Sequence, residues 1–320
     1  MSSRTLVDEL KRFDALVCGS NSPFVSLASI DSHVVILNPK GVKQDHISLT
    51  LSSLVHGNEI NGLYVINQVL EQLLCGDIRL EKPIALIVAN RQAALVNKRF
   101  LDRDLNRSFG RQGADSHEDR ICRLIEPILE RSQLVIDLHQ TIEETESPFF
   151  IFKAHQKGFE FTAHLNSAMP IVTFWNESAS ADGRTLTEFA IQHGAGAITF
   201  ETGKLGLDPS QVAVGYAICE CGIKISSGQL YDKTDLKESK IFKIDKFYRP
   251  RSKGAALYPG LRNFSSVRKG QQLGNDGDQE ILASLDGKIL FPKYGLNAVT
   301  SSELFCEIVP ISTLDAVPMI

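Results

Sequence analysis

The chain has 320 residues, with 34 Lys or Arg against 38 Asp or Glu, so its formal net charge is −4. Hydrophobic residues make up 43% and charged residues 22%, a balance that is typical of a globular protein and that excludes a charge-rich disordered chain. The slightly acidic charge gives no electrostatic reason to expect nucleic acid, and no apolar run approaches the roughly 20 residues of a membrane-spanning helix.

Hydrophobic periodicity predicts the elements of the first two thirds of the chain. In chain order they are a helix over 1–17, strands over 24–28, 33–37 and 47–55, a helix over 62–74, a strand over 83–89, a helix over 116–131, strands over 134–138 and 148–153, a helix over 158–168, a strand over 171–175, a helix over 185–193, a strand over 197–201 and a helix over 209–227. Strands that alternate with helices indicate an α/β fold, with a mostly parallel or mixed sheet and helices on both faces.

The composition changes near residue 230. The charged segment over 231–239 is typical of a linker, and beyond it we find short strands separated by Gly and Pro. We therefore expect a large domain over 1–232 and a small all-β domain over 233–320.

The first candidate metal ligands are His56 and Glu59, which follow the predicted strand over 47–55. Residues three apart in a turn or at a helix start lie on one face, so an imidazole and a carboxylate can point at one ion. The same pair also fits an ordinary helix start with an acid near the positive end of the helix dipole. Alone, the pattern leaves both interpretations open.

Two further polar residues stand at the ends of predicted strands, at the sheet edge where open α/β folds bind their ligands. His139 directly follows an apolar run, and Asp137 lies on the same face and could orient its ring. Glu201 ends another strand, where a carboxylate suits a general base. A satisfied histidine and an acid paired with Lys204 are the ordinary alternatives.

A run of alternating charges occupies residues 99–107. Arg99 and Arg107 carry guanidinium groups, which bind carboxylates through two hydrogen bonds and stabilise a developing oxyanion. Asn106 is a neutral hydrogen-bond partner for a substrate. The same run is also typical of a solvated surface loop.

Taken together, these residues fit a metal-dependent hydrolase. Two histidines and a glutamate are the three protein ligands of a catalytic zinc site, and a second glutamate can act on water in the fourth position. Ligand type alone leaves other divalent ions open. The sequence has no serine-nucleophile elbow, phosphate-binding loop or dinucleotide fingerprint, and Cys219 and Cys221 lie in a predicted helix without nearby histidines.

These motifs resemble those of the succinylglutamate desuccinylase and aspartoacylase family, a branch of the zinc carboxypeptidase superfamily. The resemblance rests on His56-Gly-Asn-Glu59, the segment over 99–107, Asp137-Leu-His139 and Glu201-Thr-Gly-Lys204, which follow the family's order. It covers most of residues 50–230 and extends loosely into the C-terminal part.

The resemblance implies a zinc carboxypeptidase-like fold, one zinc ion per chain and a set of residue roles. The implied roles are metal ligation by His56, Glu59 and His139, catalysis by Glu201 and Arg99, and substrate binding by Asn106, Arg107 and Tyr294. The implied reaction is hydrolysis of the amide bond of an N-acyl amino acid or similar small substrate by metal-activated water.

One feature departs from the family pattern. The acidic run formed by Glu143, Glu144 and Glu146 follows His139, and near the mouth of the site it would repel an anionic substrate and favour one with an amine or guanidine group. The same acids on a loop that points away from the site would have no such effect.

Two alternatives for the function stay open. One is a zinc carboxypeptidase that acts on short peptides, including cell-wall peptides, and the other is a catalytically inactive binding module of the same fold. Few cysteines and an N-terminus without the apolar core of a secretory signal predict a cytoplasmic protein. The expected partner is a small molecule, an N-acyl amino acid or short peptide, without nucleic acid or membrane, and homo-oligomer formation stays open.

Overall fold

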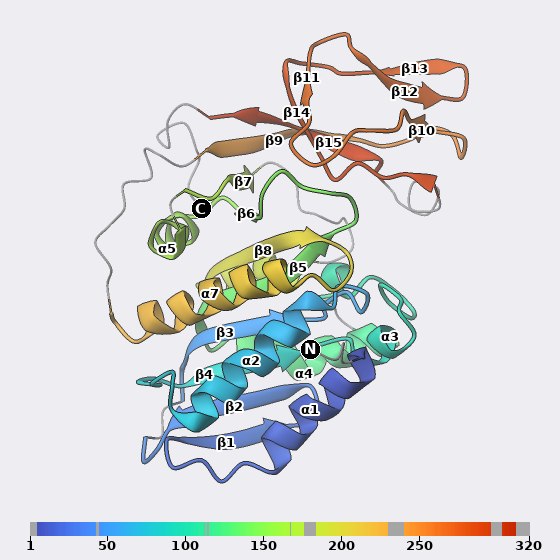
Figure 1. The fold of residues 1–320 in the computed structure, drawn as a ribbon. Helices are drawn as coiled ribbons and strands as arrows, with labels where there is room; N and C mark the ends of the chain where they lie inside the picture. The colour runs from blue at the N-terminus through green and yellow to red at the C-terminus, as the bar shows by residue number, and fades with distance from the viewer. Residues whose placement is uncertain are drawn as a thin grey trace.

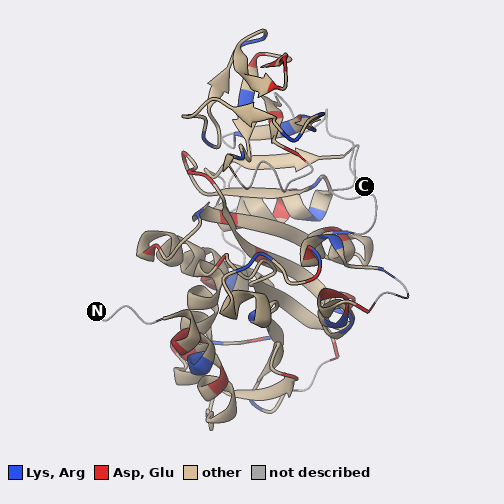
Figure 2. Cartoon of the chain, turned by 90° about the vertical axis from the view of Figure 1, so that its right-hand side faces the viewer, with Lys and Arg blue, Asp and Glu red and all other residues tan. Residues whose placement is uncertain are grey.

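The computed structural model describes residues 5–42, 45–111, 113, 115–166, 168–175, 184–229, 240–295 and 303–311. The described part of the chain forms a twelve-stranded sheet with helices on both faces, and its C-terminal strands gather at one end of the molecule (Figure 1). Acidic and basic residues are both scattered over the described chain (Figure 2). No described helix is both long and apolar enough to cross a bilayer.

The predicted helices and strands of the first two thirds of the chain are present, with shifted ends. The first elements are α1 (Leu6–Cys18), β1 (Val25–Ile30), β2 (Val34–Pro39), β3 (Ile47–Ser53), α2 (Asn61–Cys75), β4 (Ile84–Val88), α3 (Arg91–Leu95), the 3-10 turn η1 (Leu105–Arg107) and α4 (His117–Leu129). The next are β5 (Ser132–Thr141), β6 (Phe149–Lys153), α5 (Gln156–Asn166), β7 (Ile171–Phe174), α6 (Leu186–Gln192), β8 (Gly196–Lys204) and α7 (Pro209–Ser226). The short α3 and η1 were not predicted.

Capping boxes determine where two helices near the site begin. Ser116 precedes α4 and accepts a hydrogen bond from the Asp119 N–H, while the Asp119 carboxylate accepts one from the Ser116 N–H. Thr185 and Glu188 form the same reciprocal pair before α6. These pairs satisfy N–H groups that a helix start otherwise leaves without a partner.

The sheet is mixed, which agrees with the mostly parallel or mixed sheet that the sequence predicts. Its strand order is β1-β2-β4-β3-β5-β8-β6-β7-β9-β15-β14-β11. The last four strands in this order are β9 (Ile241–Tyr248), β15 (Phe305–Pro310), β14 (Gly287–Leu290) and β11 (Ser266–Val267). Strands β4, β3, β5 and β8 pair in parallel and form the centre. Strand β6 then pairs antiparallel with β8 and parallel with β7.

Apolar side chains on both faces of the central strands explain why these strands read as continuous hydrophobic runs. In β4, Leu86 and Val88 belong to a core cluster shared with α1, α2, α5 and α7, whereas Ala85 and Ile87 belong to a second cluster shared with α4 and α6. Alternating side chains therefore bury the sheet under helices on either side.

The described elements of the C-terminal part are strands. They are β9 (Ile241–Tyr248), β10 (Ala256–Leu257), β11 (Ser266–Val267), β12 (Gln272–Asp276), β13 (Gln279–Leu282), β14 (Gly287–Leu290) and β15 (Phe305–Pro310). Strands β10, β12 and β13 form a separate small sheet, while β9 pairs with β7 and so continues the large one. The predicted linker over 231–239 and the boundary after residue 232 lie outside the described residues, so this division stays a prediction.

Candidate active site

His56 and Glu59 lie in the tight connection between β3 and α2, which packs directly against the segment that carries Arg99. The Gly57 N–H donates to the Arg99 carbonyl at 3.0 Å. A Cβ atom at position 57 would come within 2.3 Å of the Ala94 nitrogen, so the close approach of the two backbones requires glycine here. The connection therefore brings the His-x-x-Glu motif and the arginine segment together.

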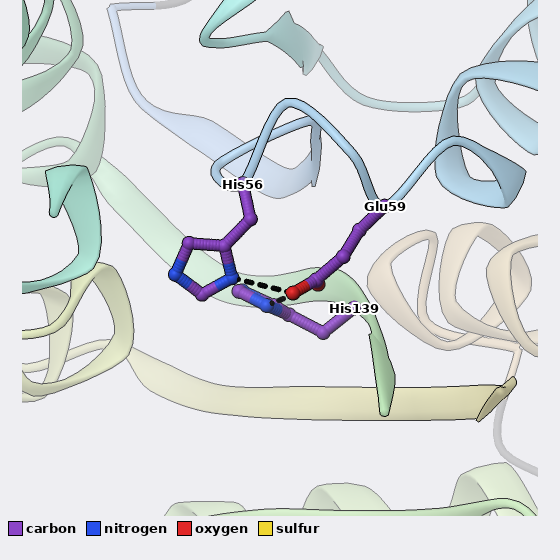
Figure 3. A group of neighbouring side chains, drawn as sticks. All are labelled: His56, Glu59 and His139. Carbon is purple, nitrogen blue, oxygen red and sulfur yellow. Dashed lines mark hydrogen bonds and ion pairs between the residues drawn. The ribbon is translucent and has the colours of Figure 1, made fainter. Parts of the chain in front are cut away.

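The three predicted metal ligands meet around the Glu59 carboxylate (Figure 3). His56 Nδ1 lies 2.7 Å from Glu59 Oε1, and His139 Nδ1 lies 2.8 Å from Glu59 Oε2. All three side chains are buried, and their ligand atoms lie within 4.8 Å of one another. Two imidazole nitrogens and a carboxylate oxygen are the donor set that zinc takes in catalytic sites, so these residues fit the ion.

A carboxylate contacts the other ring nitrogen of each histidine. His139 Nε2 lies 2.7 Å from Asp137 Oδ2, as the sequence suggests, and His56 Nε2 lies 3.2 Å from Asp104 Oδ1. Burial disfavours a charged imidazole, but Asp137 and Glu59 outweigh it and hold the pKa of His139 well above its usual value. A metal ion at this site would therefore take the place of a proton.

Burial alone would raise the pKa of Glu59, yet the two histidines lower it below its ordinary value. Its Oε2 also accepts the Gln140 N–H at 2.9 Å. Glu59 is thus an anionic group held by neighbours on both sides, which suits a metal ligand.

Glu201 lies beside His139, because the two residues are paired in the register of β8 and β5. Strand β8 continues to Lys204, so Glu201 is inside the strand rather than at its end. Its Oε2 is buried and has no hydrogen-bond partner among the described residues, while Lys204 pairs with Glu144 at 3.8 Å. Burial raises the pKa of Glu201 to about 8. An unpartnered buried carboxyl beside a ligand cluster is typical of a functional group.

Asp104 holds Arg99 at the cavity. The guanidinium donates through Nε and Nη2 to Asp104 Oδ2 at 3.2 and 3.1 Å, and Nη1 lies 3.4 Å from Glu59 Oε1. Burial would lower the pKa of Arg99, but Asp104 and Glu59 outweigh it, so the side chain stays charged. Asp104 was overlooked as a site residue, although it lies within the predicted segment over 99–107.

Asn106 and Arg107 both line the cavity, but Asn106 has a structural contact as well. Asn106 Oδ1 accepts the Leu186 N–H at the start of α6 at 2.9 Å. Arg107 Nη1 donates to the Asn106 carbonyl at 2.6 Å, and no carboxylate of the described residues forms an ion pair with Arg107. Arg107 therefore remains available for an anionic ligand.

A buried carboxylate that sequence reasoning missed anchors the segment that carries these residues. Glu118, fully buried in the first turn of α4, accepts hydrogen bonds from the backbone N–H groups of three successive residues and from the Asn90 side chain. The three donors are Leu101 at 2.8 Å, Asp102 at 3.1 Å and Arg103 at 3.2 Å. The sequence alone does not distinguish Glu118 from a solvent-exposed acid, and the fold is needed to show that its carboxylate binds backbone N–H groups.

A cavity of about 700 Å³ joins the ligand cluster, Glu201 and the arginine segment to the C-terminal strands. Tyr294 is not brought to it, since its hydroxyl donates to the Leu261 carbonyl at 2.9 Å. The neighbouring Lys293 lines the cavity instead. Burial lowers the pKa of Lys293, with Glu303 opposing this shift and Arg99 adding to it.

The acidic run does not line the cavity. Asn263 holds the backbone carbonyls of Glu143 and Glu144 through its side-chain amide, Glu144 pairs with Lys204, and Glu146 lies 3.6 Å from Lys288. These acids therefore agree with the alternative that they lie on a loop directed away from the site. They give no reason to exclude an anionic substrate.

The chain is similar in sequence to known proteins. The profile of the succinylglutamate desuccinylase/aspartoacylase catalytic domain matches residues 45–213. The chain is 26% identical to the succinylglutamate desuccinylase of Serratia proteamaculans over 288 residues, 83% of this chain and 86% of that one.

Solved structures share the fold. The succinylglutamate desuccinylase of Chromobacterium violaceum superposes with a TM-score of 0.74 at 20% identity, covering 95% of this chain and 98% of that one. Murine aminoacylase 3 superposes with a TM-score of 0.65 at 17% identity, covering 84% and 97%. The predicted fold class and family are thus confirmed. The chain belongs to the succinylglutamate desuccinylase/aspartoacylase family.

Proposed function

We propose that this protein is a zinc-dependent hydrolase that cleaves the amide bond of an N-acyl amino acid or a similar small substrate. The observation that carries the proposal is the buried cluster of His56, Glu59 and His139 with Glu201 beside it in one cavity. Relatives named as desuccinylases and an aminoacylase support hydrolysis of this kind of bond.

His56, Glu59 and His139 would hold the ion, and Asp137 and Asp104 would orient the two imidazoles through their other ring nitrogens. A bound zinc ion supplies a Lewis acid that polarises a carbonyl and lowers the pKa of water. The ligands come from the connection after β3 and from strand β5, which are far apart in the chain, so the folded protein presents them together.

Glu201 is the proposed proton carrier. It accepts the proton of the attacking water and delivers it to the leaving amine nitrogen. Burial raises its pKa to about 8, and a dication in the neighbouring cluster would favour the ionised carboxylate that a base requires. Burial and a nearby dication would thus shift the pKa of Glu201 in opposite directions. A carboxyl group whose pKa is balanced in this way can both accept a proton and release it again.

Two arginines suit the two places where the substrate carries or develops negative charge, its carboxylate and the oxygen of its scissile carbonyl. Arg99 is held in place by Asp104 and would stabilise negative charge that develops on the scissile carbonyl oxygen. Arg107, which has no described carboxylate partner, would bind the substrate carboxylate. Asn106 would support this binding from the same turn, because its carbonyl holds the Arg107 guanidinium.

The decisive experiment compares zinc-loaded wild type with Glu201→Gln on a panel of N-acyl amino acids and short peptides. We expect kcat to fall by about 100-fold or more in the variant while its zinc content stays unchanged. Glu160→Gln, an exposed glutamate in α5, is the matched control. A full rate in Glu201→Gln would contradict the proposed base, and cleavage of peptides only at C-terminal residues would favour a carboxypeptidase.

A further inference from the structure

We infer that Asn263 is a positioning residue for substrate binding, which holds Lys293 at the cavity by tying the segment over 291–293 to the loop that follows β5. This inference rests on the proposed hydrolase function, since its readout is the binding of a substrate in that cavity. Asn263 itself does not line the cavity. Three observations carry the inference: the fully paired amide of Asn263, the constrained backbone of Phe291, and the place of Lys293 in a cavity with two arginines.

Both polar atoms of the Asn263 side chain have partners. The residue is fully buried, and its Nδ2 donates to the Glu143 carbonyl at 3.0 Å and to the Glu144 carbonyl at 3.1 Å. Its Oδ1 accepts the Phe291 N–H at 2.7 Å. An amide group offers donor hydrogens and an acceptor oxygen, and here the donors face one segment while the acceptor faces another. The side chain therefore joins two stretches of chain that are far apart in sequence.

The loop that accepts the amide hydrogens directly follows the strand that carries a candidate metal ligand. Strand β5 contains His139 and ends at Thr141, and the Thr141 hydroxyl donates to the Glu143 carbonyl at 2.6 Å. The Asn263 N–H also donates to the Glu144 carbonyl, at 2.9 Å. The loop is thus bound to the end of β5 on one side and to Asn263 on the other.

Phe291 has an unusual backbone conformation at the other end of this connection. Its φ is 54°, in the left-handed region that residues other than glycine seldom adopt. Such conformations persist where the surroundings enforce them, and the hydrogen bond to Asn263 is one such constraint. Phe291 lines the cavity, and Pro292, whose ring fixes its own φ, transmits the direction of the backbone to Lys293.

Lys293 is the cation that this segment brings to the cavity. Its side chain lines the cavity together with two arginines of the segment over 99–107. Its ammonium group donates to the Glu303 carbonyl at 2.8 Å, and its backbone N–H donates to the Leu304 carbonyl at 3.0 Å. Both contacts lie within the C-terminal part of the chain, so they do not fix the lysine relative to the arginines. The Asn263 amide supplies a contact between the two parts.

Removal of the amide should therefore weaken substrate binding more than it slows the chemical step. Lys293 would keep its charge but lose its fixed place, whereas the metal ligands and Glu201 would keep their contacts. A substrate anion then gains less from the lysine, and the loss is measured as a higher KM. A merely structural role of Asn263 would instead reduce the amount of folded protein and leave the KM of the folded fraction unchanged.

The test is a double-mutant cycle on the full-length zinc-loaded chain, with the N-acyl amino acid that is cleaved fastest as substrate. We expect Asn263→Ala to raise KM about fivefold with kcat within about twofold of wild type, and Lys293→Met to raise KM about tenfold. The double variant should also show about a tenfold rise, because Asn263 acts through Lys293, whereas independent sites would give about fiftyfold. A fiftyfold rise, or an unchanged KM in Asn263→Ala, would overturn the inference and leave the hydrolase function intact.

Further variants and a binding measurement keep the test decisive. Asn275→Ala, an exposed asparagine of β12, is the matched control and should keep the wild-type KM. Asn263→Asp serves if Asn263→Ala does not fold by circular dichroism, since it keeps an acceptor for the Phe291 N–H but places a carboxylate oxygen against two carbonyls. The same pattern of KM is expected from it.

A wild type that cleaves no N-acyl amino acid would contradict the proposed function, and calorimetric Kd values of N-acetylglutamate for the same variants would then decide the inference. A double variant that binds no more weakly than Lys293→Met, with Asn263→Ala weaker than wild type, would support it. Losses that multiply in the double variant, or no binding to the wild type, would overturn it.

Discussion

Each candidate histidine ligand has one ring nitrogen that faces away from Glu59. In both histidines an aspartate carboxylate contacts this nitrogen. Asp137 lies on the same strand as His139, and Asp104 reaches His56 from the arginine segment. Such contacts fix the tautomer and the direction of the ring, so that Nδ1 presents its lone pair to an ion. Asp104 also binds Arg99, so one residue contacts both a candidate metal ligand and the guanidinium that is proposed to act in catalysis.

Asp137→Asn should weaken zinc binding about 10- to 100-fold, because the amide cannot match the charge that holds His139. Competition with a chromophoric chelator measures the affinity directly. Asp245→Asn, on the exposed side of β9, is the matched control and should keep the wild-type affinity. Unchanged zinc affinity in Asp137→Asn would show that the carboxylate does not support the ligand.

Residue patterns predict the ligand cluster and the support of His139 by Asp137, but not the support of His56 by Asp104. His56 and Glu59 are three apart, and His139 and Glu201 follow apolar runs, so local sequence reveals them. Asp104 is 48 residues from His56, and its contact arises from the close packing at Gly57. Lys293 and Tyr294 are neighbours in sequence, and only the path of the backbone places the lysine rather than the tyrosine at the cavity.

At the scale of elements, the arginine segment over 99–107 is fixed by its neighbours. The first turn of α4 supplies Glu118, whose carboxylate accepts hydrogen bonds from three successive backbone N–H groups. The connection after β3 supplies Gly57, and α6 supplies the N–H that Asn106 accepts. Arg99, Asn106 and Arg107 can therefore keep their places without lying in a regular helix or strand.

Glu118→Gln should lower kcat/KM about tenfold or more, because an amide NH₂ replaces one acceptor of the backbone N–H groups and loosens the segment. Hydrogen exchange should become faster at Leu101, Asp102 and Arg103. Glu130→Gln, at the exposed end of α4, is the control and should leave both measurements unchanged. Wild-type exchange in Glu118→Gln would contradict the anchoring role.

At the scale of the whole molecule, the C-terminal strands complete the cavity. Alternation of elements predicts the central α/β sheet and its helices, and the Gly- and Pro-rich spacing predicts a β region at the C-terminus. The pairing of β9 with β7, which extends the large sheet toward that region, has no comparable local signal. Strand partners far apart in sequence depend on the whole packing, and this is why the residues that β7 and β9 bring to the cavity, Phe174, Ile244 and Phe247, were not predicted.

Lys293→Met should raise KM for an N-acyl amino acid about tenfold, because it removes a positive charge that faces the arginine side of the cavity. Tyr294→Phe should change KM by less than about twofold, since its hydroxyl bonds to backbone carbonyls away from the cavity. Steady-state kinetics on the two purified variants make the comparison. A larger effect from Tyr294→Phe than from Lys293→Met would contradict the placement of these residues.

The measurement that tests the central claim most directly is the zinc content of the purified chain, determined by elemental mass spectrometry alongside amide hydrolysis. The proposed site predicts one zinc ion per chain in the wild type, loss of the ion in His56→Ala and in His139→Ala, and activity that disappears with a chelator and returns when zinc is restored. A wild type that binds no divalent metal, or variants that keep the full metal content, would contradict it.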